Sequence, residues 1–222
     1  YGIYTVGSTG STLTISVTGN TITDCSLTAA SPTGAMYGIY NAVACDAFVV
    51  TGNVLRGFSA AATGFFAAID NAGVVFTTLT ISNNQLGTAA SGLFSITGTM
   101  GNTYGILNEN SLSATAVNIN NNSLDKFSCA NASLLVGIGN LSTLATLNIK
   151  NNQLGSVTGT WLTCSAAQGG QIRGIYNGGT STGAVIEISG NDITGINTPV
   201  SSGAQLFIWN NAIGASQTIS NN

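Results

Sequence analysis

One phrase of eight residues recurs along the chain and constrains its fold more than any other feature. It reads apolar, any, apolar, any, Gly or Asn, Asn, any, Leu or Ile. A fixed period of this kind is the mark of a repeat architecture. The copies occupy residues 15–22 (ISVTGNTI), 48–55 (FVVTGNVL), 79–86 (LTISNNQL), 117–124 (VNINNNSL), 147–154 (LNIKNNQL), 186–193 (IEISGNDI) and, cut short, 217–222 (QTISNN).

A second phrase, of the type Tyr-Gly-Ile-Tyr-Asn, precedes each copy of the first. Two independent phrases in constant order indicate an array of repeats rather than chance. The sixth residue of each first phrase, always Asn, serves as an anchor, and successive anchors are 33, 31, 38, 30, 39 and 31 residues apart. The second phrase occupies residues 1–5, 37–41, 67–71, 104–108, 136–140, 173–177 and 206–210.

Both phrases alternate apolar and other residues with a period of two, which predicts short strands with one buried face. Gly-Asn or Asn-Asn at the end of the first phrase tolerates a left-handed backbone, so the chain can turn a corner there. A looser apolar stretch, such as residues 92–96 or 160–164, supplies a third strand. We therefore predict one all-β domain over residues 1–222, a right-handed parallel β-helix of about seven coils of about 34 residues, with three strands per coil.

Other repeat folds fit less well. Leucine-rich repeats need a shorter period, and a propeller blade needs four antiparallel strands. The two phrases resemble those of the right-handed parallel β-helix superfamily, the pectate-lyase-like fold, over the whole chain. They look closest to very long, repeat-rich secreted proteins of bacterial surfaces, which carry Gly-Ile-Tyr-Asn and Ile-x-x-Asn-x-Ile phrases. The resemblance implies an extracellular or cell-surface location.

The composition excludes several classes of function. Only 11 of the 222 residues are charged, four Lys or Arg and seven Asp or Glu, and there is no His. Four cations cannot neutralise a track of phosphates, so the chain is not a strongly basic nucleic-acid binder. Chemistry that needs an imidazole base or ligand is excluded as well. No run of about 18 apolar residues is present, so we do not expect insertion into a membrane.

Stacked turns place equivalent residues above one another about 4.8 Å apart. Two asparagine columns follow from this register, and we predict that their amides form structural ladders. The first column comprises Asn20, Asn53, Asn84, Asn122, Asn152 and Asn191; the second comprises Asn41, Asn71, Asn108, Asn140, Asn177 and Asn210.

Two of the four cysteines, Cys129 and Cys164, are 35 residues apart, which is about one turn. If their columns match, their separation suits a disulfide. The alternative is two buried free thiols, which an apolar column accommodates well.

The acidic residues do not form columns, because no two of them in adjacent turns share a position relative to the anchors. Glu187 and Asp192 flank one anchor, with Lys150 and Arg173 before it, and an acidic pair of the kind that glycosidases use is an alternative there. The Ser and Thr residues have no His partner that would make them nucleophiles. We predict no enzymatic activity, no metal and no cofactor.

One outward column is rich in aromatic residues. It is the position after the Ile of the second phrase, and exposed rings there would stack on sugars or pack against a protein. Cover by a neighbouring loop or protomer is the alternative. The column reads Tyr4, Tyr40, Asp70, Leu107, Gly139, Tyr176 and Trp209.

The chain opens directly in a strand phrase at Tyr1 and stops within another at Asn222. Solenoids need caps or they stack onto other edges, so we expect a segment of a longer repeat protein or of a filament. Its partners would be other copies or further repeats end to end, and cell-surface glycans or proteins. The predicted function is a non-catalytic extracellular rod, a stalk, adhesin or filament segment; the alternative is a β-helix that binds or cleaves carbohydrate.

Overall fold

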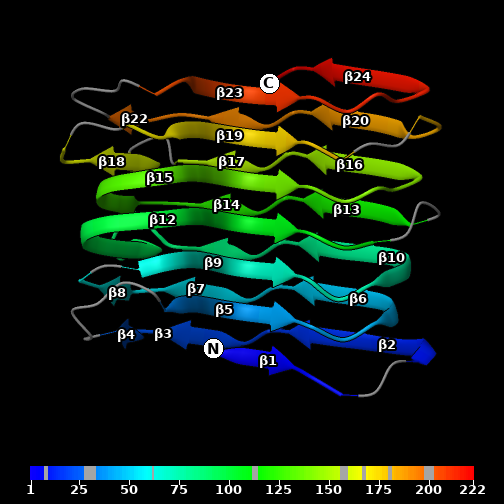
Figure 1. The fold of residues 1–222 in the computed structure, drawn as a ribbon, viewed down its shortest axis with the longest axis horizontal. Helices are drawn as coiled ribbons and strands as arrows, with labels where there is room; N and C mark the ends of the chain where they lie inside the picture. The colour runs from blue at the N-terminus through cyan, green and yellow to red at the C-terminus, as the bar shows by residue number, and fades with distance from the viewer. Residues whose placement is uncertain are drawn as a thin grey trace.

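The computed structural model describes residues 1–7, 10–27, 34–61, 63–111, 115–155, 160–166, 169–179, 182–197 and 203–222. Within these ranges the chain forms strands and no helix, so none that could span a membrane. All strand pairs are parallel, and the chain winds as a β-solenoid with three sheets (Figure 1). In Figure 1 the nearest strands run to the right, the chain returns behind them, and each turn rises, which makes the coil right-handed.

The first sheet has 11 strands and bends around a corner of the coil. Seven of them carry the Tyr-Gly-Ile-Tyr-Asn phrase, and four lie beyond the corner. They are β1 (Ile3–Thr5), β5 (Ala35–Asn41), β9 (Thr63–Asn71), β12 (Phe94–Asn108), β15 (Phe127–Asn140), β19 (Gln171–Asn177) and β23 (Gln205–Asn210), with β4 (Ser26–Leu27), β8 (Phe58–Ala60), β18 (Leu162–Cys164) and β22 (Ile196–Asn197) beyond the corner.

The second and third sheets lie on either side of the asparagine anchor. The second, of seven strands, comprises β2 (Gly10–Thr18), β6 (Cys45–Thr51), β10 (Val75–Ser82), β13 (Ala116–Asn120), β16 (Thr146–Lys150), β20 (Val185–Ser189) and β24 (Ser216–Ser220). The third, of six short strands, comprises β3 (Thr21–Thr23), β7 (Val54–Arg56), β11 (Gln85–Leu86), β14 (Ser123–Leu124), β17 (Gln153–Leu154) and β21 (Asp192–Ile193).

The predicted all-β parallel solenoid is confirmed, with about six turns rather than seven. The seven strands of the second sheet are separated by only six turns. The looser third stretch also differs from expectation, because in β12 and β15 it continues without a break into the Tyr-Gly-Ile-Tyr-Asn strand. These two long strands join the two parts of the first sheet.

The corner between the second and third sheets has the predicted left-handed backbone. The residue before the anchor has a φ of 57° at Asn83 and Asn121 and 55° at Asn151, and Gly19 and Gly52 have a φ of 66° at the same position. Asn and Gly adopt this conformation at low cost, whereas a branched side chain does not. The choice of residue at this corner thus follows from the turn that the coil requires.

The interior is a column of apolar side chains. Phe66, Phe94, Phe127 and Trp161 lie in successive turns and are almost wholly buried, with ring centroids 4.7, 4.7 and 6.0 Å apart. Phe94 pairs in register with Phe58 and Phe127 of the adjacent turns, whereas Phe66 and Trp161 pack against this column from neighbouring positions. A coil of this kind therefore buries its core between turns as well as between sheets.

The first asparagine column forms a continuous ladder. Each anchor donates its backbone N–H and its Nδ2 to the Oδ1 of the next anchor, at 2.9–3.1 Å, from Asn20 through to Asn222. The remaining Nδ2 proton of Asn122 goes to the carbonyl of Ile81 at 2.9 Å. All four hydrogen-bonding positions of such an amide are filled.

The second column is a simpler ladder. Asn41 Nδ2 donates to Asn71 Oδ1 at 2.7 Å, and the same bond recurs at 2.8–2.9 Å up to Asn210. At the start of the column Thr5 takes the place of Asn, and its hydroxyl donates to Asn41 Oδ1 at 2.6 Å. Both ladders therefore run along the axis and tie each turn to the next.

Candidate functional site

The outer surface of the first sheet carries the aromatic residues, because the second phrase bends at its Gly-Ile step. Ile39 is wholly buried in the core. A Cβ on Gly38 would lie 2.4 Å from Leu55 Cδ2, so this residue also faces inward. Two successive inward positions leave Tyr37 and Tyr40 both outside, with ring centroids 4.5 Å apart. We call this surface the outer aromatic face.

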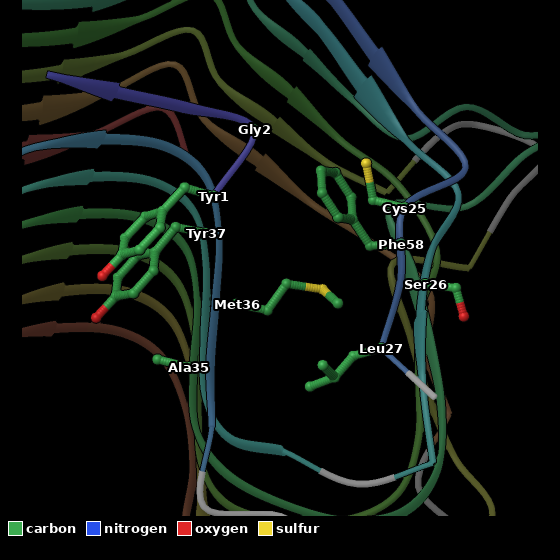
Figure 2. Close-up of a pocket in the computed structure, with 9 residues that line it drawn as sticks. All are labelled: Tyr1, Gly2, Cys25, Ser26, Leu27, Ala35, Met36, Tyr37 and Phe58. Atoms are coloured by element: carbon green, nitrogen blue, oxygen red, sulfur yellow. The ribbon is translucent and has the colours of Figure 1, made fainter. Parts of the chain in front are cut away.

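At the N-terminal end of this face four tyrosines form one cluster. Tyr4 pairs with Tyr40 in register, and their rings stack with centroids 5.4 Å apart. Tyr1 lies over Tyr37 with ring centroids 5.1 Å apart and the ring planes only 5° apart; Figure 2 shows the two rings stacked one over the other. The rings therefore cover one another's faces, and stacking on a sugar is restricted to the rings at the margin of the cluster.

The centre of the face is closed. Tyr104 lies over Gly139 of the next turn, where an added Cβ would sit 3.3 Å from the ring. Leu107 and Val136 are wholly buried, and with Ala67 and Tyr104 they form a small second core outside the coil. The predicted outward column exists in register. However, its middle members Asp70, Leu107 and Gly139 are buried beneath neighbouring rings.

The C-terminal end of the face holds a cation on aromatic rings. Tyr176 and Trp209 pair in register with ring centroids 5.2 Å apart. The Arg173 guanidinium lies 4.0 Å from the Tyr176 centroid and 4.2 Å from that of Trp209. Gln171 accepts hydrogen bonds from the same guanidinium. This half-buried group is the positive end of the face.

Asp70 is the unusual residue of the face. Its side chain is 1% exposed, and its Oδ1 has no hydrogen-bond partner in the structure. Burial, and to a lesser extent the charge of Glu109, raises the pKa of this carboxyl to about 8. Burial and the charge of Asp70 in turn raise the pKa of Tyr37 to about 12.

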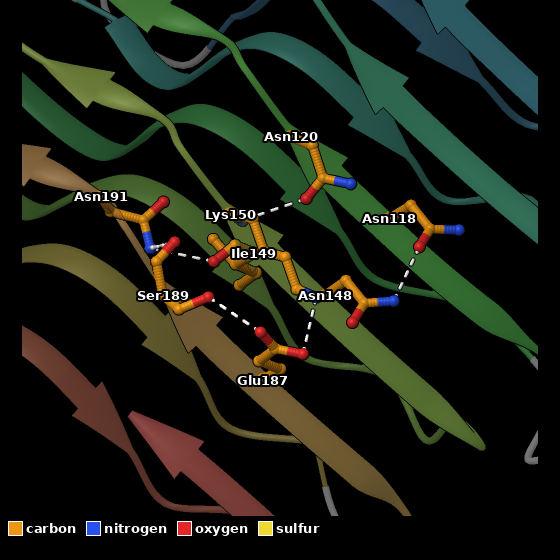
Figure 3. A network of polar contacts seen from close by, with 8 residues as sticks. All are labelled: Asn118, Asn120, Asn148, Ile149, Lys150, Glu187, Ser189 and Asn191. Atoms are coloured by element: carbon orange, nitrogen blue, oxygen red, sulfur yellow. Dashed lines mark hydrogen bonds and ion pairs between the residues drawn. The ribbon is translucent and has the colours of Figure 1, made fainter. Parts of the chain in front are cut away.

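The outer surface of the second sheet is different, and Figure 3 shows its polar network. Lys150 Nζ lies 2.6 Å from Glu187 Oε2, and Ser189 donates to the same carboxylate. Next to this pair, Asn148 Nδ2 donates to Asn118 Oδ1 at 2.8 Å. The contacts of Lys150 and Ser189 with the Glu187 carboxylate lower its pKa.

The acidic pair considered from the sequence is not assembled. Glu187 lies on the second sheet and is paired with Lys150, whereas Asp192 begins β21 of the third sheet, beyond the corner. Over the described ranges no three Cys, Asp or Glu side chains come together as a metal site would require. The two acidic residues therefore lie on different sheets, and one of them is already paired with a cation.

The two cysteines do share a column. Cys129 and Cys164 pair in register between β15 and β18, and their sulfurs are 3.4 Å apart. Both are almost wholly buried and are free thiols in the structure, not a disulfide. The hydrogen bond between the sulfurs, together with burial, raises the pKa of the Cys129 thiol. Of the two alternatives from the sequence, the structure shows the thiol pair.

One pocket opens beside the tyrosine cluster. It has a volume of about 200 Å³ and lies between the segment around Cys25 and the start of β5. Figure 2 shows Met36, Leu27 and Phe58 pointing into it. These are residues of the coil interior, so the pocket is an opening into the apolar core rather than a polar ligand site.

Comparisons with known proteins add no relative. No family model matches the sequence, and neither the curated proteins nor the solved structures provide a match.

Sequence reasoning had selected Tyr4, Tyr40, Tyr176 and Trp209, and the structure places them as two pairs at opposite ends of one face. It missed a second outward column, at the residue before Gly in the phrase. The signal was present in the letters Tyr-Gly-Ile-Tyr, whose tyrosines flank two inward residues. The missed members on this column are Tyr1, Tyr37, Tyr104 and Arg173.

Proposed function

We propose that this chain is a non-catalytic structural rod of the cell exterior, a stalk, adhesin or filament segment. The observation that carries the proposal is the first ladder, which joins every turn and fills all the hydrogen-bonding positions of its buried amides. A chain that commits so many polar groups to axial stacking is organised for length and stiffness. Its phrases also resemble those of secreted, pectate-lyase-like repeat proteins of bacterial surfaces.

The charge distribution supports the same function. Stacked outward columns would bring like charges about 4.8 Å apart, where they repel. This chain avoids the repulsion by using Ser, Thr and Asn outside, and its one ion pair among the described residues, Lys150 with Glu187, joins opposite charges in adjacent turns. Solubility without charge suits a rod in an environment of variable salt.

The partner that we propose is a further coil of the same register, in the same polypeptide or in a second copy. The first ladder has a direction, because donors always point to the next turn. Asn222 Nδ2 donates to the Ile188 carbonyl, and an adjoining coil would offer its own Oδ1 as the next acceptor. Head-to-tail stacking would therefore continue the ladder without reversing it.

Two experiments test the rod. Secretion and surface display of the full-length protein would be followed by labelling intact cells, and we expect the chain to be accessible from outside. The purified chain would also be incubated with a panel of neutral and acidic polysaccharides, and we expect no turnover. Turnover that disappears in Glu187→Gln would overturn the proposal and restore the enzymatic alternative.

A second candidate function is carbohydrate binding, and the half-buried Trp209 ring beside Arg173 favours it. Such a ring offers an apolar platform next to a donor group. A glycan array would test it, with Trp209→Ala expected to lose any binding and Thr80→Ala, on the second sheet, expected to keep it. An array without signal would exclude this second function.

A further inference from the structure

Asp70 lies on strand β9, at the centre of the outer aromatic face. In its column it pairs with Tyr40 on one side and with Leu107 on the other. The Phe65 ring lies between the rings of Tyr37 and Tyr104, with centroids 5.3 Å and 5.7 Å away. It therefore spans the Ala67 position between those two turns. The carboxyl is therefore enclosed by side chains of three successive strands, β5, β9 and β12.

No positive charge compensates this carboxyl. From β5 the ionisable groups near it are Tyr37 and Tyr40, on which the Asp70 charge acts, with Tyr1 of the turn before beside them. From β12 they are Tyr104 and the acid Glu109 just after the strand. The cation of the face, Arg173 on β19, acts on Tyr104 and is held by Tyr176, Trp209 and Gln171. An ionised Asp70 would thus be buried among rings and next to a like charge.

The face and the coil beneath it are held by different forces. The rings over Asp70 contact one another, with centroids 4.5 Å apart for Tyr37 and Tyr40, and 5.3 and 5.7 Å from Phe65 to Tyr37 and Tyr104. By contrast, Asn71, the next residue, belongs to the second ladder and bonds to Asn41 and Asn108. The small outer core can therefore open while the turns stay stacked.

We propose that Asp70 makes the outer aromatic face a pH-sensitive switch, closed while the carboxyl is protonated and open once it has lost its proton to water. In the closed state Ala67, Leu107 and Tyr104 are covered. In the open state the carboxylate is hydrated, the rings of Tyr37, Tyr40 and Phe65 move apart, and the apolar surface of the small outer core becomes exposed.

The direction of the effect follows from the pKa. Because the carboxyl titrates near 8 in the folded chain and near 4 when unfolded, the folded state binds the proton more tightly between these values. The contribution of Asp70 to stability is therefore greatest below about pH 4, declines as the pH rises toward 8 and is level above it. The tyrosines ionise later, since Tyr37 has a pKa of about 12 and that of Tyr40 is raised.

The test follows the near-ultraviolet circular dichroism of the aromatic residues of the full chain from pH 6 to pH 9, with far-ultraviolet dichroism as the measure of the coil. We expect a near-ultraviolet transition with a midpoint below the closed-state value of about 8, because hydration in the open state lowers the pKa of the carboxyl, and no far-ultraviolet change. Asp70→Asn, which keeps the shape and cannot ionise, should abolish the transition. The matched variant Glu109→Gln should keep it and move its midpoint to lower pH.

Carbon NMR of the Asp70 carboxyl in the unmodified chain provides a second measurement that does not depend on any variant folding. A titration between about pH 5 and pH 8 that coincides with the dichroism supports the switch. A titration below pH 5, or a near-ultraviolet transition that persists in Asp70→Asn, would overturn it.

Discussion

The outer surfaces of the first and second sheets face solvent from the same coil, yet they are built in opposite ways. On the first sheet, rings from successive turns pack into a small apolar core, in which Tyr104 is 5% exposed and Leu107 is not exposed at all. On the second sheet, Thr80, Asn118 and Asn148 stay partly exposed, and Asn148 donates a hydrogen bond to Asn118. Identical stacking geometry thus permits either a second core or a wet surface.

The difference arises from one bend. In the first sheet the Gly-Ile step directs two residues inward, so the flanking side chains converge outside and bury each other. In the second sheet strict alternation keeps outward side chains two residues apart along the strand. We infer that the first surface contributes to stability and that the second contributes to solubility.

The largest effect that separates the two surfaces is expected from truncating a buried outer residue. Leu107→Ala should lower the free energy of unfolding by about 3 kcal/mol, because it opens a cavity in the small outer core. The matched change on the second sheet, Val49→Ala, removes a half-buried apolar group and should cost under about 1 kcal/mol. Urea unfolding of both variants measures the difference; equal costs would show that the outer core does not stabilise the coil.

A smaller effect is expected at Arg173. Replacing it with Met keeps the apolar stem but removes the cation from the rings of Tyr176 and Trp209, and should cost about 1 kcal/mol. Lys150→Met, which removes a cation from the second sheet, should cost less, because that side chain is partly in water. The same urea assay applies, and a greater loss in Lys150→Met would reverse our ranking of the surfaces.

The smallest effect is expected at Glu187, whose ion pair is exposed. Because its pKa is lowered in the folded chain, its contribution is present above its unfolded pKa and is lost as the pH falls through the folded value. Thermal unfolding between pH 3 and pH 6 should therefore show a small difference between Glu187→Gln and the unmodified chain, confined to the higher pH. Raising the salt concentration should remove it; a difference that survives high salt would contradict a surface role.

The repeat phrases were sufficient to predict the strands, the parallel register and the asparagine columns. Each phrase sets its own period of two, and the anchors set the register between turns. The corner residues were also predictable, since Asn83 and Gly52 are types that accept a left-handed backbone.

The burial of the outer aromatic face could not be predicted in this way. Whether Asp70 is covered depends on rings from other turns, and no pattern within one phrase encodes that cover. Likewise, the number of turns depends on how the first and last copies pair. A count of the phrases therefore gives a slightly larger number of turns than the structure has. The sequence pattern predicts the contacts along one column of equivalent residues, but it does not predict the contacts between different columns.

The measurement that tests the account most directly compares Asn118, within strand β13, with Asn122, at the corner that follows this strand. Asn122 is 1% exposed, its Oδ1 accepts from Asn84 N and Nδ2, and its Nδ2 donates to Ile81 and Asn152. Asn118, four residues earlier, faces outward and accepts a single bond from Asn148.

Urea unfolding should show that Asn122→Ala costs about 4 kcal/mol, because it leaves several buried groups without partners, and that Asn118→Ala costs under about 1 kcal/mol. Similar costs for the two variants, or a loss under 1 kcal/mol for Asn122→Ala, would contradict the claim that the buried ladder holds the turns of the rod together.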